Sequence, residues 1–582
     1  MNTEINKELF NIFKTMSSIY RYMGGEEHFR SLAYSKAAKV IATLPKDISF
    51  YIKNNTLKEL PGIGEGIADK IEEYVSTGKI EKYERLKATT PSELIDMMEI
   101  KGFGPQTLKR IHDELKISTK DQLVKALQDG SIAGIKGMGL KKTEKMHRGL
   151  KLHKTIEERM FLWDALEAGE KLKSWFAKIK EVKQVELAGS LRRRKETIGD
   201  FDILVACAEQ HRKKIIDAFA TSEFVKHVIA KGFTKLSIIL KDAGKQVDLR
   251  VINEEEWGAA LQYFTGSKEH NIHLRTIAKE KGYKISEYGI FNSNTNKRIA
   301  GKTEEDIYRT LGIQLMPPEM REDKGEIELA TKKRIPELIT LQDIKGDLQM
   351  HSNWSDGMNT IEEIARHVKK KFPYQYIVIT DHSKSSRIAN GMDEKQILKQ
   401  LKEIEQVNAK LGGSFVKKGI EVDILPDGKL DISDEILSQL DWVTAAIHSN
   451  FNKDNTTRIV RACENIYVNC IGHPTGRLIG SREPYKLDME EMVNAAIHTH
   501  TAFEINAQPQ RLDLNDEWAM LAREKGVPLV ISTDSHSLSN FDYMKLGVFV
   551  AKRAWCIKQD VLNTKPWKEL ELFRKKKQKS GN

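Results

Sequence analysis

The pattern of apolar and polar positions changes several times along this chain. Residues 1–150 repeat short apolar stripes at helical spacing, broken by glycine turns as in PGIGEGIADKIEEYVSTG. Four β-type apolar runs follow, VELAGS, DFDILVACA, KLSIIL and QVDLRV, and a helical stretch begins near Trp257. The Pro-Pro segment with mixed charges around Met316–Arg334 is typical of a linker. After Leu341, short apolar runs alternate with amphipathic helices, which predicts a β/α architecture.

These changes divide the chain into six segments. A chain of 582 residues is too long for one hydrophobic core, since single cores stop growing near roughly 250–300 residues. We expect helical segments, an α/β domain followed by a helical segment, a linker and a second large α/β domain. The expected boundaries are 1–90, 91–150, 151–256, 257–320, 321–340 and 341–575.

Three N-terminal segments repeat the form apolar residue, x-Gly-x-Gly, then a helix with a basic or polar face. They are LPGIGEGIADKI at 60–71, IKGFGPQTLKRI at 100–111 and IKGMGLKKTEKM at 135–146. A two-glycine turn lets backbone N–H groups approach a phosphate, and the following helix N-terminus favours negative charge. This is the helix-hairpin-helix pattern of proteins that bind the DNA backbone without reading its sequence. The glycines that we expect at DNA are Gly62, Gly64, Gly66, Gly102, Gly104, Gly137 and Gly139.

Three aspartates lie on predicted strands in the next segment. Asp200 and Asp202 are two residues apart at the start of an apolar run, so both point to one face of a strand. Asp248 lies on another predicted strand, in QVDLRV. Adjacent carboxylates repel one another unless a cation lies between them, and Mg²⁺ prefers carboxylate and phosphate oxygens. The upstream Gly-Ser-x-x-Arg stretch can offer a backbone N–H, a hydroxyl and a guanidinium to a triphosphate.

Together with the Tyr-Phe-Thr-Gly-Ser segment at 263–267, these motifs resemble the family X DNA polymerases, such as polymerase beta, built on the nucleotidyltransferase fold. The resemblance implies that a primer 3′-hydroxyl attacks the α-phosphorus of a deoxynucleoside triphosphate, with two Mg²⁺ ions held by Asp200, Asp202 and Asp248. It implies that 1–90 is an 8 kDa-like DNA-binding domain, 91–150 fingers, 151–256 palm and 257–320 thumb. The implied nucleotide contacts are Gly189, Ser190, Arg193, Tyr263, Phe264, Gly266, Asn271 and Arg275. One departure is Gln246, where polymerase beta carries an arginine.

The first hairpin also resembles the small domain of polymerase beta that removes 5′-deoxyribose phosphate through a lysine Schiff base. The family lysine falls on Lys70, in IADKI. A lysine there is nucleophilic if it is desolvated or lies near other cations. The alternative is that Lys70 only contacts a DNA phosphate, because a second lysine of that family site is Gly66 here.

Histidines follow the apolar runs of the last segment. Five of the eight histidines after residue 341 come directly after such a run. Strand-then-ligand, repeated with helices between, is typical of a parallel β/α barrel, whose functional residues collect at the C-terminal strand ends. Seven strands are expected near 346–351, 376–380, 415–421, 442–447, 467–472, 503–507 and 528–534.

The ordered motifs HSNWSDG, TDHS, GIEVD, AIHSN, IGHP and TDSH resemble the polymerase-and-histidinol-phosphatase (PHP) domain, a seven-stranded barrel that holds up to three metals. By match, the ligands are His351, Asp356, His382, Glu421, His448, His473, Asp534 and His536. The family's first His is Gln349 here, and a carboxamide is a poorer ligand than imidazole. The mixed N/O set suits two to three Mn²⁺ or Zn²⁺ ions. The resemblance implies a 3′→5′ exonuclease; a small-molecule phosphatase or a structural metal module are the alternatives.

Composition and charge bear on the partners of the protein and on its cellular compartment. The net charge of +11 favours polyanionic partners. Four cysteines without a CxxC pair suit a reducing cytoplasm. The chain contains no apolar run of membrane-spanning length, and we expect no secretory signal, because the first residues lack a basic start followed by an apolar stretch. We expect a cytoplasmic monomer that acts on gapped or primed DNA with deoxynucleoside triphosphates in DNA repair, including base excision repair.

Overall fold

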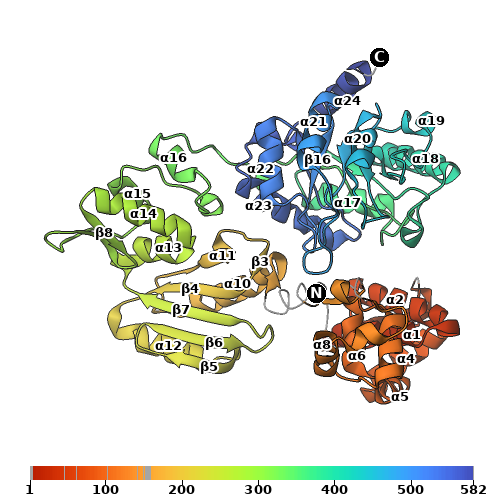
Figure 1. The fold of residues 1–582 in the computed structure, drawn as a ribbon, viewed down its shortest axis with the longest axis horizontal. Helices are drawn as coiled ribbons and strands as arrows, with labels where there is room; N and C mark the ends of the chain where they lie inside the picture. The colour runs from red at the N-terminus through yellow and green to blue at the C-terminus, as the bar shows by residue number, and fades with distance from the viewer. Residues whose placement is uncertain are drawn as a thin grey trace. The chain divides into compact units, whose positions relative to one another are not determined.

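The computed structural model describes residues 4–44, 46–60, 62–100, 102–139, 142–147, 150 and 159–580. It consists of two compact units, one built on residues 1–155 and the other on residues 156–479 and 483–582. The first unit is red to orange in Figure 1, and the palm, thumb and barrel of the second follow from yellow to blue. Pro61, Lys101, Leu140 and Lys141 of the hairpin motifs, and residues 151–158 at the expected start of the palm, lie outside the described residues.

The first unit is helical, as the glycine-punctuated pattern predicts. Its long helix α1 packs on α2, and one apolar core that includes Phe13, Ile71 and Leu108 runs through the expected 8 kDa-like and fingers segments. The described helices are α1 (Glu4–Met23), α2 (His28–Thr43), α3 (Ile48–Lys53), α4 (Glu65–Thr77), α5 (Glu81–Thr89), α6 (Ser92–Asp96), α7 (Pro105–Leu115) and α8 (Lys120–Gln128). Residues 142–147 are also helical.

The palm is a five-stranded sheet in the order β2-β4-β7-β6-β5, in which only β4 and β7 are parallel. Its strands are β2 (Gln184–Leu187), β4 (Asp200–Ala206), β7 (Gln246–Ile252), β6 (Lys235–Leu240) and β5 (Val225–Lys231). Alternate residues of β4 pack on helices α10 (Leu162–Ala177) and α12 (Arg212–Ala220). The others face α13 (Trp257–Thr265). Asp200 and Asp202 lie on this second face, next to Leu204.

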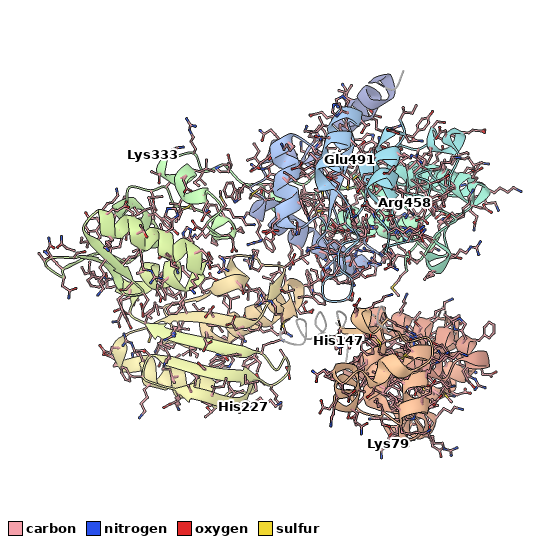
Figure 2. All side chains as sticks on the ribbon, in the orientation of Figure 1. Lys79, His147, His227, Lys333, Arg458 and Glu491 are labelled. Atoms are coloured by element: carbon pink, nitrogen blue, oxygen red, sulfur yellow. The ribbon has the colours of Figure 1, made fainter. Side chains whose placement is uncertain are left out.

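The edge strand β5 is the palm strand that the apolar pattern misses. It reads VKHVIAK, and all but its first residue are exposed, including His227 in Figure 2. An exposed edge strand needs no apolar alternation, because neither of its faces is buried.

The thumb adds helices to a small antiparallel sheet, and it extends into the expected linker. It contains α13, α14 (Lys268–Glu280), α15 (Glu304–Thr310) and the sheet β10-β9-β8 (Arg298–Ala300, Gly289–Asn292, Tyr283–Ser286). Within 321–340, helix α16 (Glu326–Thr331) places Ile327 and Ala330 in the thumb core. Arg321 is also buried, and it donates to the Glu304 carboxylate at 2.5 Å.

The C-terminal domain is a nearly closed barrel of seven parallel strands, which confirms the predicted strands. The order is β11 to β17 in sequence, and a parallel bridge between Met350 and Ser535 links its two ends. Tyr376, Val378 and Trp442 share an apolar cluster with Leu570 of α24 (Trp567–Ser580), whereas Ile377 packs in the outer core. The strands are β11 (Gly346–Asp347), β12 (Tyr376–Ile379), β13 (Val416–Asp423), β14 (Trp442–Ala446), β15 (Cys470–Ile471), β16 (Ala502–Asn506) and β17 (Leu529–Ser532).

Helices follow the barrel strands. They are α17 (Ile361–Lys371), α18 (Glu394–Leu411), α19 (Asp434–Leu437), α20 (Thr456–Glu464), α21 (Met489–Thr499), α22 (Asp516–Lys525), α23 (Met544–Arg553) and α24. Among the helices of the described residues, none is both long and apolar enough to cross a membrane.

Candidate functional site

The three palm aspartates lie side by side on neighbouring strands. The parallel register pairs Asp202 with Asp248 and Asp200 with Gln246. Gly189 lies against them with φ +59°, and a Cβ there would come within 2.2 Å of Asp202 Oδ2, so only glycine fits. The Gln246 carboxamide donates to Asp248 at 2.9 Å, and the Ser237 hydroxyl also donates to it. Gln246 therefore orients the third carboxylate from the position where polymerase beta has an arginine.

The electrostatics of this cluster call for a cation. Burial, together with the neighbouring Asp200 and Asp248 carboxylates, raises the pKa of Asp202 to about 7. A divalent cation between the carboxylates would remove the repulsion that raises this pKa. The oxygen-only donor set fits Mg²⁺.

The structure brings two of the expected nucleotide-contacting elements together next to the carboxylates. Arg193, which follows the short helix α11 (Gly189–Arg192), donates from Nη1 to the Thr265 carbonyl at 2.6 Å. Gly266 has φ +71°, and a Cβ there would lie 3.1 Å from the same nitrogen. The backbone at the end of α13 and the guanidinium therefore form one surface. Ser190 lies in α11, partly exposed.

The remaining expected nucleotide contacts bond among themselves in the thumb. Asn271 accepts from Gln262 at 2.7 Å and donates to the Tyr263 carbonyl at 2.7 Å, so its carboxamide fixes the corner between α13 and α14. Arg275 donates to the Asn271 carbonyl at 3.2 Å and lies 5.9 Å from the Tyr263 ring centroid. Phe264 packs against the side chain of Tyr263.

All eight expected ligands of the barrel meet at the C-terminal ends of its strands. The side chains form three groups whose ligand atoms lie within 4.8 Å of one another. His473 joins them through a 2.9 Å contact between its Nε2 and Glu421 Oε1. The groups are His351, Asp356, His382 and His536; His382, Glu421 and His448; and His351, Glu421 and Asp534.

Their donor atoms fit divalent cations. The buried atoms His351 Nδ1, His382 Nδ1, His473 Nδ1 and Glu421 Oε2 make no hydrogen bond to any described residue. The His351 ring also stacks on His382 and His536, with centroids 4.4 and 4.3 Å away. Imidazoles crowded around buried carboxylates, with ligand atoms left without hydrogen bonds, are typical of a polynuclear metal site.

The charges of this centre depend on one another. Burial opposes a charge on His351, but Asp534, Glu421 and Asp356 outweigh it and raise the pKa of His351 to about 10. The same balance raises the pKa of His448 to about 9, mainly through Glu421 and Asp423. Although burial alone would raise it, the surrounding imidazoles hold the pKa of Glu421 well below its usual range. Positive charge is thus strongly favoured among these carboxylates.

Gln349 lies in the same centre. It is buried, its Nε2 makes no hydrogen bond to a described residue, and its Oε1 lies 3.5 Å from where a Cβ on Gly472 would be. The carboxamide therefore points towards the end of β15, next to the expected ligands.

Three further residues of the centre were missed by the sequence interpretation. Asp423 accepts from His448 Nδ1 at 2.7 Å and fixes that ring. Glu504 accepts from the His473 backbone N–H at 2.5 Å, and burial raises its pKa well above the usual range. Arg511 has a buried Nη1 without a hydrogen bond to any described residue, and its Nε lies 3.9 Å from Asp534 Oδ2.

Strand periodicity could have found two of these residues. Asp423 lies two residues after Glu421 on β13, and Glu504 lies between the outward Phe503 and Ile505 on β16. Arg511 lies in a loop, where no periodicity applies.

The three hairpin motifs share one backbone geometry. The first glycines, Gly62, Gly102 and Gly137, have φ of +96°, +102° and +79°. The second glycines precede helices: Gly64 caps α4, Gly104 caps α7, and the Gly139 carbonyl accepts from Lys142 N–H at 2.8 Å. A Cβ on Gly64, Gly66, Gly104 or Gly139 would meet nothing within 4 Å. The second turn positions thus leave backbone and helix N-termini open to a ligand such as phosphate.

Lys70 lines a cavity of about 450 Å³ beside the first hairpin. Its Nζ donates to the Gly66 carbonyl at 3.1 Å, and Arg30, Tyr34 and Lys82 line the same cavity. The cavity therefore gathers three cationic side chains around an open glycine turn.

Four family models match the chain. They are a helix-hairpin-helix domain at 4–80, a SAM-like helix-hairpin-helix tandem at 55–118 and 94–152, the DNA polymerase beta palm at 159–255 and the DNA polymerase beta thumb at 260–322. The chain is also 38% identical to the DNA polymerase/3′-5′ exonuclease PolX of Bacillus subtilis (strain 168), over 98% of this chain and 99% of that protein. The chain belongs to the family X DNA polymerases of the PolX type.

Two other relatives cover parts of this PolX-type chain. The DNA polymerase lambda of Arabidopsis thaliana is 26% identical over 55% of the chain and 62% of its own length. A probable phosphatase of Thermoanaerobacter sp. (strain X514) is 31% identical over 38% of the chain and 91% of its own length. The family models and the Bacillus subtilis relative confirm the predicted family and fold.

Proposed function

We propose that this chain is a DNA-directed DNA polymerase that fills short gaps during DNA repair. The observation that carries the proposal is the register of Asp202 with Asp248 on parallel strands, with Asp200 and the Arg193 guanidinium beside them. The names of the PolX and lambda relatives support it. The open hairpin turns supply backbone N–H groups for the phosphates of a gapped duplex.

The palm residues have distinct roles in nucleotide addition. Asp200, Asp202 and Asp248 would hold two Mg²⁺ ions, which supply activation of the primer hydroxyl and neutralise the triphosphate. Arg193 and the turn at Gly266 orient the triphosphate, and Tyr263 and Phe264 border the sugar pocket. The primer 3′-oxygen attacks the α-phosphorus in line, its proton passes to solvent water, and pyrophosphate departs from the opposite side as the bond between the α-phosphorus and the bridging oxygen breaks.

Extension across a one-nucleotide gap tests this proposal. Asp248→Asn should reduce the rate at least a hundredfold, because it removes a metal ligand, whereas Asp242→Asn on an exposed palm turn should not change it. Equal extension by the two variants would overturn the assignment.

For the barrel, we propose a metal-dependent 3′→5′ exonuclease. The eight convergent ligands would hold two to three Mn²⁺ or Zn²⁺ ions, which supply an activated water and a sink for negative charge. His448 is oriented by Asp423, and the free edge of Arg511 is positioned to bind the phosphate. Water attacks the terminal phosphorus, and the 3′-oxygen of the preceding nucleotide leaves and takes up a proton.

The alternative is a small-molecule phosphatase, which the probable-phosphatase relative favours. Single-stranded DNA and a phosphomonoester should be offered together to the full-length chain. We expect DNA to be degraded with only slight inhibition by the phosphomonoester; the reverse preference would establish the alternative. Gln349→His should raise the bound metal measured by elemental analysis, because imidazole binds borderline metals better than a carboxamide.

We also propose a 5′-deoxyribose-phosphate lyase, on the observation that Lys70 shares its cavity with Arg30, Tyr34 and Lys82. The Lys70 amine would attack the sugar aldehyde and form an imine with loss of water; β-elimination then releases the DNA 5′-phosphate. Borohydride with an incised abasic duplex should trap a covalent adduct in wild type and in Lys82→Ala but not in Lys70→Ala. Equal trapping by Lys70→Ala would exclude this lysine.

Finally, we propose that the protein acts as a cytoplasmic monomer. Its four cysteines are all buried and none of them forms a disulfide, which suits a reducing compartment. Light scattering of the full chain tests the monomer: a mass near 66.4 kDa is expected, and twice that value would contradict it.

A further inference from the structure

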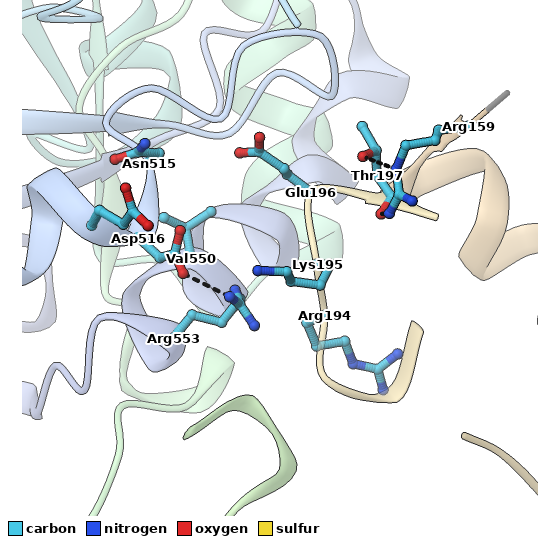
Figure 3. Close-up of a pocket in the computed structure, with 10 residues that line it drawn as sticks. Arg159, Arg194, Lys195, Glu196, Thr197, Asn515, Asp516, Val550 and Arg553 are labelled. Carbon is cyan, nitrogen blue, oxygen red and sulfur yellow. Dashed lines mark hydrogen bonds and ion pairs between the residues drawn. The ribbon is translucent and has the colours of Figure 1, made fainter. Parts of the chain in front are cut away.

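The palm and barrel pack against each other inside the second unit. Trp163 of α10 meets Tyr543 with ring centroids 4.7 Å apart, and Arg477 of the barrel forms a 2.6 Å ion pair with Glu196 of the palm. Between them lies a cavity of about 250 Å³, in which Lys195 faces Asp516 and Arg553 of the barrel (Figure 3). The two domains are thus joined by charged side chains, next to the loop that carries Arg193.

Glu322, in the thumb, holds the side chain of Arg193. The Arg193 Nε donates to Glu322 Oε1 at 3.0 Å, while its Nη1 donates to the Thr265 carbonyl at 2.6 Å. Two contacts on different nitrogens fix the plane of a guanidinium. Both side chains are only 13% exposed, so few other groups can set that orientation.

Arg553, the last residue of α23 in the barrel, contacts both Glu322 and Arg193. Its Nη1 donates to Glu322 Oε1 at 2.9 Å and to the backbone carbonyl of Arg193 at 2.9 Å. Its Nη2 donates to Asp516, the first residue of α22, at 2.6 Å. Arg553 is 4% exposed, so water competes little for these bonds.

The charges agree with this chain of contacts. Burial disfavours the charged form of Glu322, but Arg553, Arg193 and Lys195 together hold its pKa below the usual range. Without Arg553, the buried Glu322 carboxylate would lose one of its positively charged partners. Arg193 and Lys195 alone would then have to neutralise its charge.

We propose that Arg553 of the barrel is a positioning residue for the polymerase, which orients Arg193 towards the triphosphate through Glu322. This inference rests on the proposed role of Arg193 in nucleotide binding. The barrel thereby supports nucleotide addition independently of its own metal centre, and substitutions at this junction change the KM for the nucleotide more than the maximal rate.

The experiment is a double-mutant cycle in the full-length chain, read as KM and kcat for nucleotide in gap filling. Arg553→Gln and Glu322→Gln should each raise KM about tenfold or more with a smaller change in kcat. In an Arg193→Ala background, Arg553→Gln should raise KM little further, because the guanidinium that Arg553 positions is absent. Asp516→Asn, which leaves both bonds of Arg553 Nη1 to Glu322 and Arg193 in place, is the matched control and should have the smallest effect.

The outcomes separate this inference from the proposed function. Degradation of a 3′ end and the melting temperature establish that each variant is folded; if Arg553→Gln fails to fold, Glu322→Gln carries the cycle. Additive effects of Arg193→Ala and Arg553→Gln on KM, or parallel losses in all variants including Asp516→Asn, would overturn the positioning role. An unchanged KM in Arg193→Ala would instead overturn the proposed role of Arg193.

Discussion

At the scale of single residues, Asp202 shows how a binding site is built at the expense of stability. Its carboxylate lies beside two others and against a glycine that leaves no room for any side chain. The resulting rise of its pKa to about 7 means that, without metal, the folded protein disfavours the charged form. The same repulsion favours cation binding, so it lowers the free energy of unfolding of the metal-free protein alone.

Replacing Asp202 with asparagine should therefore stabilise the metal-free protein. Above pH 7 the folded state carries the repelled charge, and below the usual aspartate pKa both states are protonated. The gain should be about 1–3 kcal/mol at pH 8 in EDTA and should shrink as the pH falls from 7 towards 4. Thermal denaturation across this range measures it, with Asp242→Asn as control; a destabilised Asp202→Asn at pH 8 would contradict the electrostatic account.

Arg511 is the second residue whose environment implies a partner from outside the chain. Arg511→Met should slow 3′-end degradation about 10²–10³-fold, because a buried guanidinium donor next to Asp534, proposed to bind the phosphate, is lost. Bound metal should be unchanged, since Arg511 is not a ligand. Arg461→Met, at an exposed site on α20, is the control. A loss of metal in Arg511→Met would show that the arginine supports the centre only structurally.

At the scale of elements, the sequence predicts best where a residue pattern and a backbone geometry coincide. The barrel strands are readable because apolar runs end directly in ligands such as His448 and Asp534. The strand β5 and the thumb strands have no such signal, since they are short or exposed. Helix α16 was not predicted because its segment is rich in charged residues. Its burial depends on polar side chains that find partners far away in the sequence: Glu326 Oε1 accepts a hydrogen bond from Nδ1 of the buried His270 at 2.7 Å. Distant partners of this kind cannot be read from local sequence.

The hairpins allow a test that separates folding from binding. Gly102→Ala should cost about 1–3 kcal/mol, because φ is +102° and the new Cβ would lie 3.1 Å from the Met146 backbone. Gly104→Ala meets nothing within 4 Å, so the fold should be kept while affinity for a gapped duplex falls about threefold or more.

Fluorescence anisotropy at two salt concentrations, together with thermal denaturation, measures both effects. Gly134→Ala, an open glycine outside the three turns, should change neither stability nor affinity. Unchanged DNA binding in Gly104→Ala would mean that the phosphates do not approach this turn.

At the scale of the whole molecule, two metal-dependent centres share one chain and one compact unit. The palm cluster and the barrel cluster were both predictable from ligand spacing. The ion pairs that join the domains, such as Arg477 with Glu196, were not, because their partners are 281 residues apart. The central claim is that the two centres perform separate reactions.

The most direct test compares Asp202→Asn and His351→Ala in parallel, with extension of a gapped primer and degradation of a 3′ end measured in Mg²⁺ and in Mn²⁺. Asp202→Asn should lose extension by at least a hundredfold and keep degradation, because only the palm loses a ligand. His351→Ala should lose degradation to a similar degree and keep extension, because its contacts are to Asp534 and Glu421 in the barrel. Loss of both reactions in either variant, or of neither, would contradict the account.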